Sequence, residues 1–160
     1  MAFSMPDLPA GGGNTMTIAI ILHRKGSEVV SVLAHEPVGE VAKSLARHRI
    51  GAALVRDRAG DVLGIISERD IVRAVALHGV DSIAMPVAQL MTRALHTVTP
   101  RTRIAEALAL MTDRRVRHLP VMQEDGGLAG LVSIGDLVKA RIEEAEHVAE
   151  ELKHYVESAG

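Results

Sequence analysis

The sequence predicts a mixed α/β protein built from two similar halves, each with the element order β-α-β-β-α. The first reason is a direct repeat, in which residues 50–72 align without a gap with residues 116–138, 66 positions later. The copies are identical at Val55/Val121, Gly60/Gly126, Gly64/Gly130, Ser67/Ser133, Asp70/Asp136 and Val72/Val138. The second reason is that β-type runs and helical spacing alternate in the same order in both copies. Because halves of about 60 residues are marginal alone, we expect them to share a core.

In the first half, local signals mark each element. Pro37 suits a first helical turn, Gly60 sits in a polar loop between two β-type runs, and Gly79 fits a helix stop. The predicted elements are a short helix over 16–22 leading into the first repeat, a strand over 29–33, a helix over 38–48, strands over 52–56 and 62–67, and a helix over 68–78.

The second half repeats this order and ends in a longer helix. We expect a short helix over 87–91, a strand near 95–98, a helix over about 102–114, strands over 118–122 and 128–133, and a last helix from near Ile134. Its apolar residues Val138, Ile142, Ala145, Ala149, Leu152 and Val156 follow alternating steps of four and three. This seam fits packing on its own domain or a contact between subunits. The expected divisions are a flexible leader 1–15, a first repeat 16–80, a second repeat 81–146 and a helical extension 147–160.

Composition excludes several classes of function. The 160 residues include one Tyr, one Phe and no Trp, so aromatic platforms for single-stranded nucleic acid are absent. A net charge of −2 without a basic run argues against a nucleic-acid partner. The chain has no Cys, which excludes disulfides and fits a cytoplasmic location, and no apolar run approaches a membrane span. No metal-binding or catalytic signature occurs, so we expect neither a metal site nor an enzyme.

The most distinctive repeated feature is Gly-apolar-apolar-Ser-x-x-Asp at the end of a strand. Ser-x-x-acid before a helix is typical of a capping box, which would make the motif structural. However, both copies also keep a Gly that capping does not need, and Gly lets another group approach the backbone closely. A carboxylate beside a helix N-terminus can accept ribose hydroxyls, and the helix end favours phosphate. The duplication therefore favours a binding role.

The repeat resembles the CBS domain, and the tandem resembles a short stand-alone Bateman module. The resemblance rests on the two motifs in register, the strand His118-Leu119-Pro120-Val121 and the Glu40/Glu106 helix, and it covers roughly residues 17–145. It implies that the two repeats pack sheet to sheet and form two clefts. It also implies an adenosyl ligand, namely AMP, ADP, ATP or NAD, with S-adenosylmethionine less favoured, and no catalytic cofactor.

The resemblance also assigns site residues by position. The ribose-binding residues would be Ser67, Asp70, Ser133 and Asp136. The adenine cleft would be lined by Ile50, Gly51, Ala52, Val116, Leu119 and Pro120. The phosphate candidates are Arg49, Arg69, Arg115, Arg117 and His118. Because the strand entry of the first repeat carries no basic residue, the two clefts are expected to differ in affinity.

These features predict a regulatory module that binds an adenine nucleotide and responds by a change of conformation or association. We expect a homodimer that acts on a downstream protein, with neither a nucleic acid nor a membrane as partner. The alternative is a non-catalytic dimerisation scaffold with vestigial nucleotide sites. An enzyme acting on nucleotides is a third hypothesis, for which the sequence supplies no catalytic residues.

Overall fold

The computed structural model describes residues 15–26 and 28–159, so the expected leader, apart from its last residue, lies outside the described residues. The helices are α1 (Ile18–Lys25), α2 (Val38–His48), α3 (Glu68–His78), α4 (Ile104–Arg114) and α5 (Ile134–Ser158), with 3-10 segments η1 (Gly79–Ala84) and η2 (Val87–Gln89). The strands are β1 (Ser31–Leu33), β2 (Ala52–Arg56), β3 (Val62–Ser67), β4 (His118–Met122) and β5 (Leu128–Ser133).

The predicted order of elements is confirmed, with differences at the connections. Both hairpins and the three helices α2, α3 and α5 begin where the sequence placed them. The strand expected at 29–33 shortens to three residues. The strand expected near 95–98 is not formed, because Val98 makes only an isolated parallel bridge to Val121. The short helix expected over 87–91 is the 3-10 turn η2.

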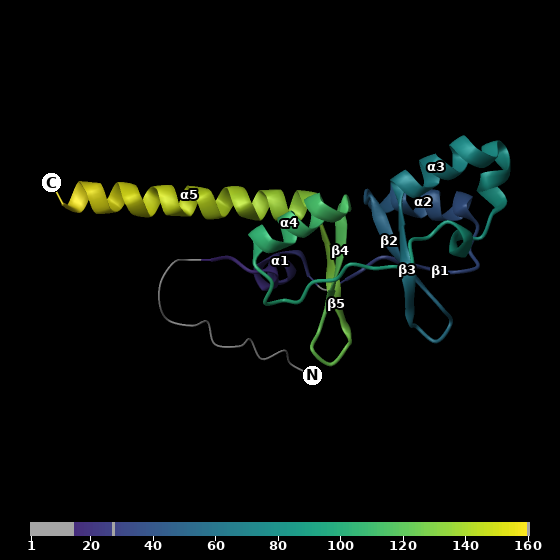
Figure 1. Cartoon of the computed structure of the whole chain (residues 1–160), viewed down its shortest axis with the longest axis horizontal. Helices are drawn as coiled ribbons and strands as arrows, with labels where there is room; N and C mark the ends of the chain where they lie inside the picture. The colour runs from purple at the N-terminus through teal and green to yellow at the C-terminus, as the bar shows by residue number, and fades with distance from the viewer. Residues whose placement is uncertain (1–14, 27, 160) are drawn as a thin grey trace.

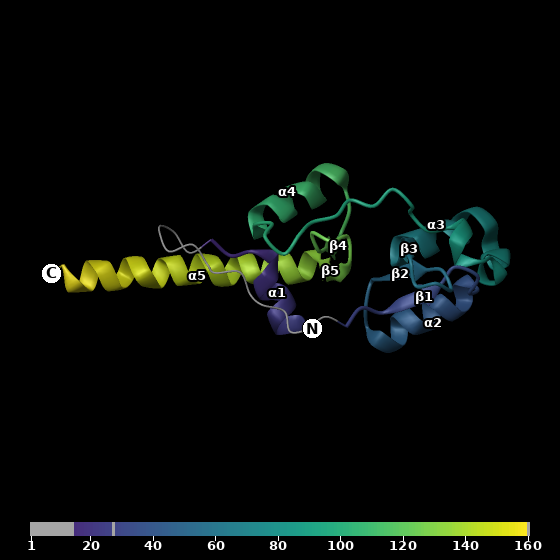
Figure 2. The same cartoon turned by 90° about the horizontal axis from the view of Figure 1, so that it is seen from below.

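The two sheets occupy the middle of the molecule, and helices lie outside them. In the first half β1 pairs parallel with β2, which pairs antiparallel with β3; in the second half β4 pairs antiparallel with β5. Along the long axis, α2 and α3 lie beyond one sheet, and α1 and α4 lie beyond the other (Figures 1 and 2). The mixed α/β class and the sheet-to-sheet order are confirmed. The yellow end of α5 projects away from the body (Figure 1).

The hydrophobic core of each half is completed by a short segment that belongs to the other half in the order of the chain. Ile18 and Ile21 of α1 fall within the predicted first repeat, yet they are buried with Leu119 and Leu137 in the second half's core. Val87 and Met91 fall within the predicted second repeat, yet they pack in the first half's core. The short helix expected to lead into the first repeat therefore packs on the second. The repeat boundaries 16–80 and 81–146 remain a prediction. The hydrophobic cores do not follow them, because each core includes a segment from the other side of the boundary.

The repeated glycines serve this exchange of segments, which corrects the interpretation of Gly as space for a ligand. A Cβ on Gly64 would lie 2.6 Å from the Thr92 backbone oxygen, and one on Gly130 would lie 2.6 Å from Leu22 Cδ2. The Ile65–Thr92 bridge and α1 cover β3 and β5 at these points. The group that approaches each glycine is thus another part of the same chain.

We predict that Gly64→Ala destabilises the protein more than Gly130→Ala does. The first Cβ meets a backbone oxygen that cannot move alone, and overpacking of this kind costs about 1–3 kcal/mol. The second meets the end of the flexible Leu22 side chain. Gly135→Ala is the control, since its Cβ would be 3.6 Å from Ser133 Oγ, an ordinary contact. Urea unfolding should give the free-energy order, and equal losses at Gly64 and Gly130 would contradict it.

Candidate functional site

Both Ser-x-x-Asp motifs form capping boxes at helix N-termini. Ser67 N donates to Asp70 Oδ2 at 2.9 Å, and Asp70 N donates to Ser67 Oγ at 3.3 Å. Ser133 N donates to Asp136 Oδ2 at 2.9 Å, and Asp136 N donates to Ser133 Oγ at 3.2 Å. The structural interpretation of the motif is therefore confirmed. It uses one carboxylate oxygen of each Asp, and among the described residues no donor reaches either Oδ1.

The first amide of each capped helix is tied to the entry of the neighbouring strand. Glu68 N donates to Gly51 O at 2.9 Å, and Ile134 N donates to Arg117 O at 2.8 Å. The acceptors are again 66 positions apart, so both halves build this corner in the same way. The corner fixes where the strand entry and the helix N-terminus meet.

A cavity of about 290 Å³ lies at this corner in the second half and reaches the first half. It is lined by Lys25, Glu28, Val29, Val30, Arg49, Ile50, Gly51, Ala52, His118, Leu131, Ser133 and Asp136. The cavity joins the two halves, because residues 49–52 at the start of β2 belong to the first repeat and Asp136 at the start of α5 belongs to the second. The site is therefore shared between the two halves.

The cavity includes some of the predicted site residues and not others. Those that line it are Arg49, Ile50, Gly51, Ala52, His118, Ser133 and Asp136. Those that do not are Ser67, Asp70, Arg69, Val116, Leu119, Pro120, Arg115 and Arg117. Leu119 is fully buried in the second core, so its side chain serves packing. Arg69, Arg115 and Arg117 are exposed.

The sequence did not predict five of the residues that line the cavity, and Lys25 is the one that contacts Asp136; the others are Glu28, Val29, Val30 and Leu131. Lys25 Nζ donates to Asp136 Oδ2 at 2.7 Å and to Leu131 O at 3.0 Å. Burial alone would raise the pKa of Asp136, but the hydrogen bonds from Lys25 and Ser133 outweigh it, and the pKa lies below its ordinary value. Asp136 is thus held ionised. Lys25 lies outside the repeated segment, so the repeat gave no signal for it.

His118 joins the two halves at the cavity wall. A Cβ on Gly51 would be 3.3 Å from His118 Cε1, so the imidazole of β4 lies against the strand entry of the first repeat. Burial lowers the pKa of His118 below 6.5, and the nearby Lys25 ammonium lowers it further. The neutral imidazole is therefore the favoured form.

Arg49 and Arg115 share an unusual backbone conformation. They end α2 and α4 in the left-handed region, with φ of 53° and 54°. Gly or Asn would adopt this conformation at lower cost, so an arginine here is locally unfavourable. Strained residues of this kind cluster at functional sites, and Arg49 lines the cavity.

Comparison with known proteins identifies the fold. The sequence model of the CBS domain matches residues 24–77 and 87–143. The chain belongs to the CBS-domain family. It is 36% identical over 155 residues to the mitochondrial CBS domain-containing protein CBSX3 of Arabidopsis thaliana, covering 91% of this chain and 74% of that protein.

Solved structures of CBS-domain proteins support the same assignment. The CBS-domain protein ATU1752 from Agrobacterium tumefaciens superposes with a TM-score of 0.77 at 42% identity, over 84% of this chain and 99% of that one. The CBS domain protein PAE2072 from Pyrobaculum aerophilum, complexed with AMP, superposes with a TM-score of 0.67 at 28% identity, over 76% and 89%. This chain therefore contains two CBS domains in tandem.

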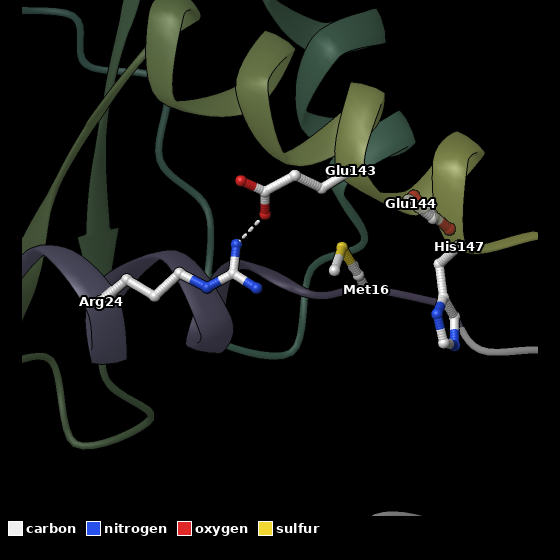
Figure 3. Close-up of a pocket in the computed structure, with 5 residues that line it drawn as sticks. All are labelled: Met16, Arg24, Glu143, Glu144 and His147. Carbon is white, nitrogen blue, oxygen red and sulfur yellow. Dashed lines mark hydrogen bonds and ion pairs between the residues drawn. The ribbon is translucent and has the colours of Figure 1, made fainter. Parts of the chain in front are cut away.

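A second cavity of about 260 Å³ lies away from the repeat motifs of the CBS pair. It is lined by Met16, Arg24, Glu143, Glu144 and His147, and Arg24 forms an ion pair with Glu143 across it (Figure 3). Its charged groups come from α1 and α5 and are already paired, since Glu144 pairs with Arg141 and His147 with Glu151. Across the described residues there is no cluster of His, Cys, Asp or Glu able to hold a metal ion, and no helix suited to crossing a membrane.

We expect the free energy of unfolding of this CBS pair to fall when the pH is lowered from about 7.5 to about 5.5. We predict that this decrease is smaller in His118→Gln than in the wild type. Because the folded pKa of His118 is lowered, its contribution is complete above 6.5 and is lost as the pH falls below it. Asp136 does not contribute in this range, since its lowered pKa affects stability only in more acidic solution. Urea unfolding at both pH values measures the effect.

His154→Gln is the control for this prediction, because His154 is exposed on α5. The wild type and His154→Gln should lose the same free energy of unfolding on acidification. A His118→Gln variant that loses as much as they do would contradict the assignment of the pH dependence to this imidazole.

Proposed function

We propose that this protein is a regulatory module that binds an adenine nucleotide in the cleft shared by its two CBS repeats. The observation that carries the proposal is the Asp136 carboxylate, half-buried at the cavity with Oδ1 free among the described residues and Oδ2 capping α5. Such a carboxylate can accept hydrogen bonds from ribose hydroxyls. The nearby helix N-terminus favours a phosphate. The AMP complex of PAE2072 supports this ligand class.

The size and lining of the cavity favour a mononucleotide over NAD. At about 290 Å³ it lies at the lower limit of small-molecule pockets, which run from about 300 to 1,000 Å³. Its apolar walls are aliphatic, from Val29, Val30, Ile50 and Leu131, and would hold the adenine ring between branched side chains. AMP is therefore the first ligand to test.

Asp70 differs from Asp136 in its surroundings, which supports unequal clefts. Asp70 Oδ2 accepts from both N and Oγ of Ser67, each at 2.9 Å, and no lysine reaches it among the described residues. It does not line the cavity that contains Asp136. We propose that the Asp136 cleft is the stronger nucleotide site.

We predict that AMP raises the melting temperature of the wild type by several degrees, because a ligand at about 100 times its dissociation constant adds about 2.7 kcal/mol. Asp136→Asn should abolish most of this shift, while Asp70→Asn, the matched control, should retain it. Asparagine keeps an oxygen for the cap in both variants. Thermal melts with AMP, ADP, ATP and NAD measure the effect.

If no nucleotide shifts the wild-type melting temperature, the scaffold alternative gains and the nucleotide proposal is wrong. If the two variants lose the shift equally, the proposal of unequal clefts is wrong, although nucleotide binding stands.

We also propose that the protein pairs with a second copy of itself along α5. Ile142, Leu152 and Val156 are more than half exposed on this helix, which extends beyond the body (Figure 1). A helical extension without tertiary packing is marginally stable in water, so a partner that covers the apolar seam would stabilise it. In a parallel pair, Arg141 of one copy lies opposite Glu146 of the other, which gives complementary charge beside the seam.

We predict that Leu152→Glu weakens self-association by more than about tenfold, because it places a charge in the proposed apolar seam. The control is Glu150→Lys, which changes a charge on the outer side of the same helix. Sedimentation velocity over a range of concentrations measures both. A Leu152→Glu variant that associates as the wild type does would show that the seam is not the contact.

A further inference from the structure

We propose that Lys25 makes the Asp136 cleft selective for adenosyl ligands whose 5′ substituent is anionic. This inference rests on the proposed function, and it names the residue that decides which class of adenosyl ligand binds. Phosphorylated nucleosides carry negative charge at the 5′ position, whereas S-adenosylmethionine carries a sulfonium there. The charge of the cleft therefore separates these two classes.

The position of Lys25 is fixed by the end of a helix. It is the last residue of α1, and Gly26 follows with φ of 85°, which ends the helix at that point. The helix itself is anchored by Ile18 and Ile21 in the second core. The ammonium is therefore delivered to the cleft by a rigid element instead of a loop, which favours a defined role in binding.

The contacts of Lys25 leave room for a ligand on both groups of the ion pair. An ammonium has three donors, and two of them are used by Asp136 Oδ2 and Leu131 O. Asp136 Oδ1 has no donor among the described residues. A ribose can thus bind Oδ1 and a phosphate oxygen can take the third Lys25 donor, with the ion pair still intact.

The charge balance of the cleft depends on Lys25. The ionised side chains that line the cavity are Lys25, Arg49, Glu28 and Asp136, so two positive charges balance two negative charges. The lowered pKa of His118 favours its neutral form. Without Lys25 the lining would carry one net negative charge, in a partly enclosed site where charge is poorly screened. That charge would repel a phosphate and attract a sulfonium.

The other half of the molecule provides an internal comparison. The residue 66 positions after Lys25 is Met91, which is buried in the first core with Val87. Among the described residues no lysine contacts Asp70, whose Oδ2 accepts only from Ser67. The substitution Lys25→Met removes the ammonium and keeps a long unbranched side chain.

The test is calorimetric titration of the wild type and Lys25→Met with adenosine, AMP and S-adenosylmethionine. In the wild type we expect AMP to bind more tightly than S-adenosylmethionine. In Lys25→Met, AMP should weaken by about tenfold or more, since a charge-assisted contact is lost. S-adenosylmethionine should bind more tightly than it does to the wild type, and adenosine should change least. Lys25→Arg should keep the wild-type preference.

Arg24→Met is the matched control, because Arg24 precedes Lys25 on α1 and pairs with Glu143 of α5 without lining the cleft. It should leave the preference unchanged. Equal weakening of all three ligands in Lys25→Met would overturn the inference and leave Lys25 a residue that only positions Asp136. A wild type that binds none of the three would instead overturn the proposed function.

Discussion

The exchange of short segments between the two halves is the packing constraint on which the rest of the structure depends. α1 closes the core of the second half, and residues 87–91 close the core of the first. Backbone hydrogen bonds hold both segments in place, from Ile18 N to Thr102 O and from Val87 N to Glu36 O, each at 2.9 Å. Neither half has a complete core from its own repeat alone. The cleft therefore forms only when the whole pair is folded.

The geometry of the caps leaves one carboxylate oxygen of each Asp available to a ligand. A capping box needs only one oxygen of the acid, and both Asp70 and Asp136 use Oδ2 for it. The cap fixes the rotamer of the carboxylate and leaves the second oxygen in a known direction. A binding residue that is also a cap is thus positioned before any ligand arrives. The duplicated Ser-x-x-Asp forms a capping box in both copies, whereas the duplicated Gly leaves space for another segment of the same chain.

The repeated segments could be predicted from sequence because their signals are local. The hairpin 52–67 is marked by β-type runs around a Gly loop, and α3 by a Ser cap and a Gly stop. The strand expected near 95–98 failed because a strand is defined by its neighbour, and only Val98 reaches β4. Lys25 could not be found because it contacts a residue 111 positions away. The sequence also could not predict that residues 49–52 of the first half face Asp136 of the second half, because tertiary packing decides this.

The last turn of α1 links the cleft to the helix that carries the apolar seam. Lys25 contacts Asp136 in the first turn of α5, and its neighbour Arg24 contacts Glu143 about two turns further along. Under the proposed function, a ligand phosphate that binds the Lys25 ammonium would act at one of the two ion pairs between α1 and α5, beside the apolar packing of Ile18 and Ile21 on Leu137. Since a ligand shifts a conformational equilibrium only by binding its states differently, the proposed nucleotide could couple to the position of α5 through the Lys25–Asp136 pair. In the first half no lysine contacts Asp70 among the described residues, and α3 ends at His78, so that half has no equivalent link.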